Sequence, residues 1–400
     1  MTWNQLAQTV LDLDTNDVSA ETFAAAGRTV LDWFGCTLAP YRTQAGNLST
    51  PVRPAQTGAL LRLLAAANCG PYDALGRNDL AVGRTVVPAA LIAATDKGAS
   101  GAALLAAIIA GYEVAARLDA AEEVATCASH DWNARAESCA AAGTAARIMG
   151  LNHAATAKVL ARAWAEPTPR PILRDVLEAW EADADTAESA VFYGGPAVES
   201  CAGDAAGAAL TRRRLRLHAA APEIHVILDA ALAIKEAHRL HPEDLEAIVI
   251  GVPQKVAESH CGDFESRPLP ANIPFCLAVA FLTGRVAGSD LKPQNLLKAP
   301  IGWVMSNVSV REDPLLAAGA ARVVVHTRYG DVHEHMMAAP RGTPENPLSA
   351  SDTLERFLNL ARPALAPGHA ERLAERVLNL DRLPNVRGLL AGLDPARPTA

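Results

Sequence analysis

Aromatic side chains are scarce in this sequence of 400 residues, at 4%, although half of the residues are hydrophobic. A core must therefore be built from alanine, leucine, valine and isoleucine, and alanine-rich windows favour closely packed helices. The length exceeds that of one ordinary hydrophobic core and predicts roughly two domains.

The sequence also lacks a net positive charge and closely spaced cysteine pairs. The net charge of -8 leaves no broad basic face for phosphates, so we expect no nucleic acid partner. Seven cysteines without a C-x-x-C pair fit reduced thiols in a cytosol. The N-terminus carries no secretory pattern, and Glu113 and Arg117 interrupt the longest apolar run, which predicts a core helix instead of a membrane span. We expect a cytoplasmic protein with no membrane partner.

Local motifs for nucleotide binding, serine hydrolysis and zinc proteolysis are missing: we find no G-x-G-x-x-G after a strand, no Walker A loop, no G-x-S-x-G and no H-E-x-x-H. His326, His333 and His335 could be drawn as metal ligands, but a full ligand set is not visible. We therefore expect no metal site.

The secondary-structure pattern of the sequence changes near Arg212, from helical patterns before it to strand-like runs after it. Ser19 can cap a helix whose apolar residues recur at helical spacing, and we expect Pro40 to end that helix; alanine-rich helical patterns follow. After residue 212 come short strand-like runs, a hairpin turn at 329–331 and a helix over 273–283 that ends at Gly284. Helical patterns resume near residue 351. The sequence predicts a mostly α fold with an α+β second domain.

Polar chemistry is concentrated in the stretch 212–235, where four arginines, His218 and His225 lie within fourteen residues. A cationic loop at a domain boundary is a candidate site for an anionic ligand, and a solvated basic loop is the alternative. His130 begins a helix, where the dipole favours the neutral imidazole that a general base needs; a capping histidine is the alternative. Tyr72 and Asp73 lie in a polar loop and are either site residues or turn residues.

Several segments together resemble the MmgE/PrpD family, which includes 2-methylcitrate dehydratase, cis-aconitate decarboxylase and iminodisuccinate epimerase. The matching segments are VSAETFAAAGRTVLDWFGCTLA, VVPAALIAATDKGASGAALLAAIIAGYEVAARL, AAAGTAARIMGL, HVILDAALAIKEAHRLHPEDLEAIVI, IPFCLAVAFLTGRV and GTPENPLSASDTLERF. The resemblance implies a helical bundle domain from residues 1–211 and 350–400, a smaller α+β lid domain from 212–349, and a homodimer. It implies no cofactor and no metal.

The sequence departs from the family at several positions that the family uses. Val198 and Cys201 stand where the family has a lysine and a histidine. His218 replaces the tyrosine of the Lys-Pro-Tyr-Pro turn, while Arg216 keeps its cation. The resemblance retains His130 and His225. A less cationic pocket makes a tricarboxylate an unfavourable ligand, since a buried carboxylate needs charge partners.

We therefore expect a cofactor-independent lyase or isomerase that dehydrates, decarboxylates, epimerises or cyclises a small carboxylate-containing biosynthetic intermediate by proton transfer. A non-catalytic binding or partner protein with the same fold is the alternative. The expected catalytic residues are His130, His225 and His218, and the expected substrate-binding residues are Arg216, Asp73, Asn272 and Tyr72.

Overall fold

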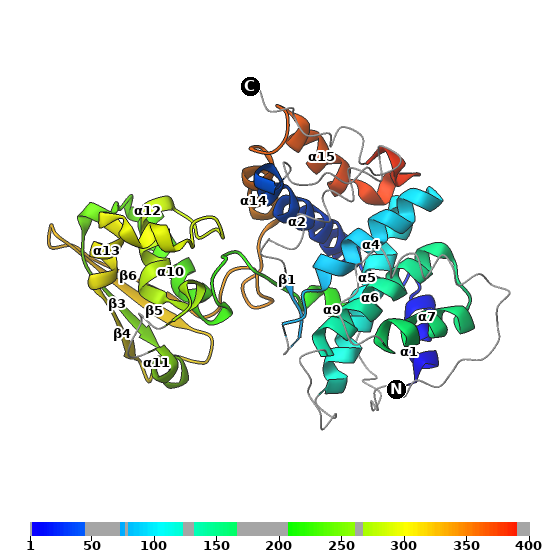
Figure 1. The fold of residues 1–400 in the computed structure, drawn as a ribbon, viewed down its shortest axis with the longest axis horizontal. Helices are drawn as coiled ribbons and strands as arrows, with labels where there is room; N and C mark the ends of the chain where they lie inside the picture. Colours follow the sequence, from blue (N-terminus) through cyan, green and yellow to red (C-terminus); the bar gives the residue numbers. More distant parts are fainter. Residues whose placement is uncertain are drawn as a thin grey trace. The chain divides into compact units, whose positions relative to one another are not determined.

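The computed structural model describes residues 2–44, 73–76, 79–122, 132–165, 207–260 and 267–389. The chain divides into two units, which are described separately (Figure 1). The helical unit comprises Met1–Arg214 and Ser349–Ala400, and the α+β unit comprises Leu215–Leu348. The chain is mostly α-helical with a smaller α+β region, as the sequence predicts.

The helical unit contains a core of long helices. Its elements are α1 (Trp3–Leu11), α2 (Ala20–Gln44), β1 (Asp73–Ala74), α4 (Val82–Lys97), α5 (Gly101–Glu122), α6 (Trp132–Met149), α7 (His153–Ala165), α9 (Ala208–Thr211), α14 (Ala350–Ala361), α15 (His369–Leu378), η7 (Leu380–Arg382) and η8 (Val386–Gly388). Helices α4, α5 and α6 pack against one another. Helix α5 is long and apolar enough to cross a membrane, but 78% of its most apolar window is buried inside the unit, as in a core helix.

Small residues let these helices approach closely. A Cβ atom added to Gly111 on α5 would lie 2.2 Å from Oγ1 of Thr144 on α6. No side chain fits there unless the side chain of Thr144 or one of the helices shifts, so packing favours glycine. Alanine and glycine therefore set the helix spacing in a core that has few aromatic rings.

Helix α2 differs from its predicted end. Ser19 accepts a hydrogen bond from the backbone N–H of Thr22 (3.1 Å), which confirms the predicted start. The prediction that Pro40 ends the helix is wrong, because α2 continues to Gln44. Proline removes one backbone donor, whereas α2 buries an apolar face that includes Val30 and Phe34. Burial of this apolar face stabilises α2 enough for the helix to continue past Pro40.

The C-terminal helices return to the N-terminal part of the chain. Helix α14 packs against α2, and the guanidinium Nε of Arg356 donates to Oδ1 of buried Asp32 at 2.7 Å. The backbone N–H of Gly101 donates to the carbonyl of Leu383 at 2.9 Å. Both ends of the chain therefore contribute to one hydrophobic core.

The α+β unit is built on a four-stranded sheet in the order β4-β3-β5-β6. Its elements are η3 (Pro222–Ile224), α10 (His225–His238), η4 (Pro242–Asp244), β3 (Leu245–Val252), α11 (Gln254–His260), η5 (Leu269–Ala271), α12 (Ile273–Thr283), η6 (Pro293–Leu297), α13 (Ala299–Ser306), β4 (Val308–Glu312), β5 (Ala321–Thr327) and β6 (Val332–Met337), with β2 (Arg214–Leu215) at its boundary. Strand β3 is parallel to β4 and antiparallel to β5, and β5 is antiparallel to β6.

Residues alternate between the two faces of the central strands. In β5, Ala321, Val323 and Val325 are buried, whereas the residues between them are partly exposed. Helix α10 packs against β5 and β6. The buried face of the sheet thus positions α10, whose first turn carries His225.

Two predictions in this unit are confirmed in detail. Helix α12 has the predicted bounds, because Asn272 caps its first turn and Gly284 ends it in a left-handed conformation with φ of 73°. The predicted hairpin is formed by β5 and β6, and Thr327 and Asp331 are joined across its turn by a backbone hydrogen bond of 2.9 Å.

Candidate functional site

The stretch between Leu215 and Ala221 is irregular, with bends at residues 218–220, and is held by neighbouring segments. Three backbone hydrogen bonds fix it: Leu215 N to Gly342 O (2.8 Å), Ala219 N to Val286 O (2.9 Å) and Ala221 N to Pro270 O (2.8 Å). The two predicted site residues on this stretch, Arg216 and His218, are therefore attached to a supported backbone. A supported backbone holds catalytic side chains in a reproducible geometry.

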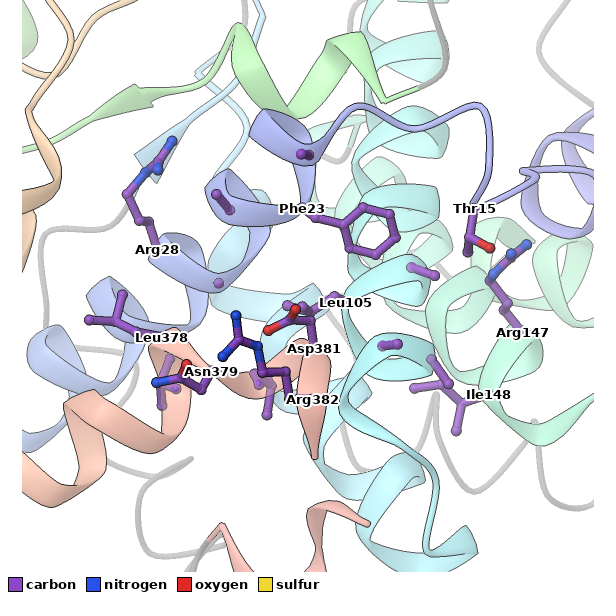
Figure 2. A pocket seen from close by; sticks show the side chains of 18 of the residues that line it. Thr15, Phe23, Arg28, Leu105, Arg147, Ile148, Leu378, Asn379, Asp381 and Arg382 are labelled. Atoms are coloured by element: carbon purple, nitrogen blue, oxygen red, sulfur yellow. The ribbon is translucent and has the colours of Figure 1, made fainter. Parts of the chain in front are cut away.

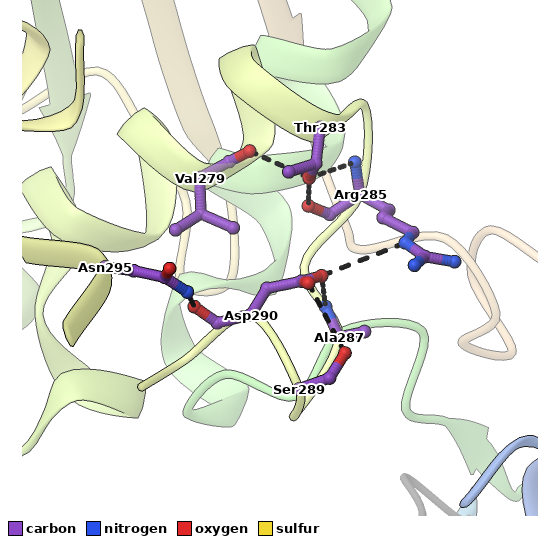
Figure 3. Close-up of polar contacts among 7 residues, drawn as sticks. All are labelled: Val279, Thr283, Arg285, Ala287, Ser289, Asp290 and Asn295. Carbon is purple, nitrogen blue, oxygen red and sulfur yellow. Dashed lines mark hydrogen bonds and ion pairs between the residues drawn. The ribbon is translucent and has the colours of Figure 1, made fainter. Parts of the chain in front are cut away.

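The loop that follows α12 is one of these supports (Figure 3). Its side chains close it on itself: Asp290 Oδ2 accepts from the backbone N–H of Ala287 (3.1 Å), and Asn295 donates to the carbonyl of Asp290 (2.7 Å). Thr283 Oγ1 donates to the carbonyl of Arg285 at 2.6 Å. The loop therefore presents the carbonyl of Val286 to Ala219, next to His218.

His218 is buried against Asp229 of α10. The Nε2 atom of His218 lies 2.9 Å from Oδ1 of Asp229, and the two residues are 6% and 5% exposed. An ionised carboxylate only accepts hydrogen bonds, so Nε2 of His218 carries the proton in this contact. The second oxygen, Oδ2, accepts from the backbone N–H of Arg341 at 2.8 Å. The carboxylate is thus bound on both sides.

His225 is the first residue of α10 and is also buried. Its Nε2 lies 3.0 Å from the carbonyl oxygen of Ala220. A carbonyl oxygen accepts, so Nε2 donates and Nδ1 holds the lone pair of the neutral ring. Burial, reinforced by the neighbouring His218, lowers the pKa of His225 to about 4. At neutral pH the ring is uncharged and Nδ1 can accept a proton.

The imidazole rings of His218 and His225 lie together but have different hydrogen-bond partners. Their centroids are 5.3 Å apart and their planes meet at 84°. His225 is kept neutral, while His218 has a carboxylate as counter-ion for its protonated form. A neutral imidazole beside a second imidazole that is bound to a carboxylate is an arrangement that acid and base chemistry can use.

Two further predicted residues, Arg216 and Asn272, belong to the same α+β unit as this pair. After burial and His218, the positive charge of Arg216 also lowers the pKa of His225. Asn272 caps α12, and its Oδ1 accepts from the backbone N–H of Phe275 at 2.9 Å. Any donor role of Asn272 therefore belongs to Nδ2. Phe275 itself is fully buried in the core of the α+β unit.

Asp73 belongs to the helical unit and is tied into its interior. It is 3% exposed, and its carboxylate accepts from Tyr112 Oη and from the backbone N–H of Gly83 at 3.0 Å. Burial raises the pKa of Asp73, while Arg213, Tyr112 and Gly83 oppose this rise. Asp73 thus binds the first turn of α4. Two other predicted residues, His130 and Tyr72, lie outside the described residues.

A pocket of about 1100 Å³ lies in the helical unit, at the ends of α2, α5, α6 and α15 (Figure 2). Phe23, Leu105 and Ile148 line it, and Asp381 lies beside Arg382. No predicted site residue among the described ones borders this pocket. Volume alone therefore does not identify the site, and the histidine pair is the better candidate on chemical grounds.

Asp229 is the site residue that the sequence analysis missed. It stands in the run HVILDAAL, one helical turn after His225 and between apolar neighbours. A carboxylate inside an apolar helical face is expensive unless it has partners, and this is the signal that could have found it. Its partner, His218 on the irregular stretch before the helix, could not be read from the helix pattern.

Comparison with known proteins gives one family. Residues 218–382 match the family model of the MmgE/PrpD C-terminal domain. The match begins at His218 and includes His225 and Asp229. No curated protein matches the chain.

Proposed function

Because the chain carries the MmgE/PrpD C-terminal domain and belongs to that family, we propose that it is a cofactor-independent lyase or isomerase that moves a proton between the paired imidazoles and a small carboxylic acid. The MmgE/PrpD family is known for dehydratase and other lyase activities. The observation that carries the proposal is the pair of His218 and His225, with ring centroids 5.3 Å apart and unlike surroundings.

His225 is the proposed base. Its Nε2 is bound to the carbonyl of Ala220, which leaves Nδ1 as the accepting atom. The lowered pKa, about 4, keeps the ring neutral at pH 7 but makes it a weak base. A weak base removes a proton effectively only where the carbanion or enolate that forms is stabilised. This supports a C–H bond next to a carboxylate or another carbonyl group as the position of attack.

His218 is the proposed acid. The carboxylate of Asp229 accompanies its protonated form, and Nδ1 is the ring nitrogen that remains for a ligand. A proton from this nitrogen can go to a leaving hydroxyl group, to an enolate carbon or to the opposite face of a stereocentre. Dehydration, decarboxylation, epimerisation and cyclisation all require such a step, so these reactions share one acid/base pair.

Arg216 is the proposed anchor for the substrate carboxylate, and Asn272 Nδ2 the proposed donor beside it. A guanidinium group can hold a carboxylate with two parallel hydrogen bonds. With one arginine in place of several cations, a monocarboxylate or a neutralised dicarboxylate suits the site better than a tricarboxylate. Asp73, His130 and Tyr72 stay proposed site residues.

Deuterium uptake tests the proposal for all four of these reactions at once. The protein is incubated in D2O with a panel of small hydroxy, unsaturated and amino carboxylic acids, and products are followed by NMR and mass spectrometry. We expect at least one compound to exchange or react, and His225→Gln or His218→Gln to slow it by at least about 100-fold.

His326→Gln is the matched control, because His326 lies on β5 outside the pair and should leave the rate unchanged. Full activity in His225→Gln, with its circular dichroism spectrum unaltered, would contradict the assignment. A panel member that raises the melting temperature but never exchanges would favour a binding protein.

We also propose a homodimer, on the basis of the family resemblance. Light scattering after size-exclusion chromatography should give about twice the chain mass of 41.9 kDa. A single species at the monomer mass, at every concentration tested, would contradict this.

A further inference from the structure

We propose that Asp229 is a positioning residue that fixes the ring of His218 and makes Nδ1 of that ring the atom that exchanges protons. The proposal rests on the proposed function of the histidine pair. Asp229 does not touch the reacting atoms in this account; it acts through His218.

The geometry of the carboxylate supports a role in orientation. Oδ1 of Asp229 lies 2.9 Å from Nε2 of His218, and Oδ2 accepts from the backbone N–H of Arg341 at 2.8 Å. The carboxylate is therefore clamped between a side chain and a backbone group, and neither oxygen can turn away without losing a hydrogen bond. Asp229 is only 5% exposed, so water offers little replacement for either partner.

Helix α10 carries both the proposed base, His225, and the residue that positions the proposed acid, Asp229. His225 and Asp229 are four residues apart on α10, so they lie on the same face of the helix. His225 supplies the base at the first turn, and Asp229 holds the acid from the next turn. A shift of α10 would therefore displace both groups together.

Replacement by asparagine should reverse the tautomer of His218. The backbone N–H of Arg341 can only donate, so the amide oxygen of Asp229→Asn would accept from it. The amide NH2 would then face Nε2 of His218 and donate to it. The neutral ring would carry its proton on Nδ1 and could no longer be protonated beside a counter-ion. This change differs from a simple loss of stability.

Several polar groups lie near His218. Asp229 on α10 binds its Nε2, the ring of His225 on α10 lies 5.3 Å from its ring between centroids, and Arg216 stands two residues before it in the chain. The positive charge of Arg216 lowers the pKa of His225, and Asp229 is the carboxylate bound to His218. Its removal should therefore change the tautomer of His218, which removal of a surface carboxylate should not.

The test uses the full chain labelled with 15N in the histidine rings. Long-range 1H–15N spectra between pH 5 and 9 give the tautomer and titration of each ring, and His218→Gln identifies the signals of His218. We expect wild-type His218 to hold its proton on Nε2, and Asp229→Asn to move it to Nδ1 in the neutral ring. Asp313→Asn removes a carboxylate that pairs with Arg322 on the sheet and should match wild type.

If the neutral ring of His218 in the wild-type protein carries its proton on Nδ1, the proposal is overturned. This measurement uses the wild-type protein alone and does not depend on whether a variant folds. An unchanged tautomer in a folded Asp229→Asn variant would overturn it as well. Asp229→Glu restores a carboxylate and should keep the proton on Nε2. If the tautomer reverses as expected while no carboxylic acid exchanges deuterium, the positioning role stands and the proposed function fails.

Discussion

At the scale of single residues, the candidate site is two imidazoles with unlike partners. His225 donates to a backbone carbonyl and is buried, which disfavours its charged form, whereas His218 faces the carboxylate of Asp229. The sequence could predict both histidines, because they lie seven residues apart in one polar stretch. It could not predict Asp229 as the partner of His218, since that contact joins a helix to an irregular segment.

The lowered pKa of His225 makes stability depend on pH. Its ordinary pKa is 6.5 and its pKa in the folded chain is about 4. Between these values the unfolded chain binds a proton that the folded chain does not, so falling pH favours unfolding. We expect this histidine to remove about 3 kcal/mol of unfolding free energy between pH 7 and pH 4.

Urea unfolding of wild type and His225→Gln at several pH values measures this effect. The difference between the two proteins isolates the histidine from the carboxylates that also titrate in this range. Parallel curves for the two proteins between pH 7 and pH 4 would show that His225 is not held neutral by the fold.

Buried thiols give a second prediction at this scale. Cys36, Cys139 and Cys276 are buried. Burial raises the pKa of Cys276 to about 12 and that of Cys36 above its usual range. The thiolate is the reactive form, so iodoacetamide at pH 8 should leave these three unmodified until the chain unfolds. Rapid labelling of Cys276 in the native protein, detected by mass spectrometry, would contradict its burial.

At the scale of elements, local signals predicted some boundaries and tertiary packing decided others. Helix α12 has caps at both ends within the sequence, Asn272 and Gly284, and its bounds could be read directly. Helix α2 crosses Pro40 because a buried apolar face outweighs one lost hydrogen bond. That balance depends on the helices packed against α2, which no local pattern contains.

Close helix packing at Gly111 is sensitive to one methyl group. An added Cβ would lie 2.2 Å from Oγ1 of Thr144, so Gly111→Ala should force α5 and α6 apart and lower the unfolding free energy by about 1–3 kcal/mol. Gly302 on α13 is the control, because nothing lies within 4 Å of the same added atom. Gly302→Ala should be neutral or stabilise by up to about 1 kcal/mol. Chemical unfolding curves of both variants measure the two changes in unfolding free energy. Equal changes in Gly111→Ala and Gly302→Ala would contradict the packing argument.

At the scale of the whole molecule, one buried ion pair joins residues far apart in the chain. Arg356 on α14 binds Asp32 on α2, and the side chain of Asp32 is 6% exposed. Arg356→Met leaves a buried carboxylate without its cation and should cost about 3–5 kcal/mol. Arg362 pairs with Glu371 at the surface, where water screens the two charges, so Arg362→Met should cost far less. Urea unfolding separates the two cases, and a loss near zero for Arg356→Met would contradict the role of this pair.

The resemblance to the MmgE/PrpD family, built from segments along the whole sequence, named the family that the domain match supports. The central claim about the reaction is that a neutral His225 takes a proton from a carbon next to a carboxylate.

The pH dependence of deuterium uptake by a reactive carboxylic acid tests that claim most directly. We predict that kcat/KM falls on the acid side as His225 is protonated near pH 4, and is reduced at every pH in His225→Gln. A rate that His225→Gln leaves unchanged, or an acid limb that persists at full activity in that variant, would contradict the account.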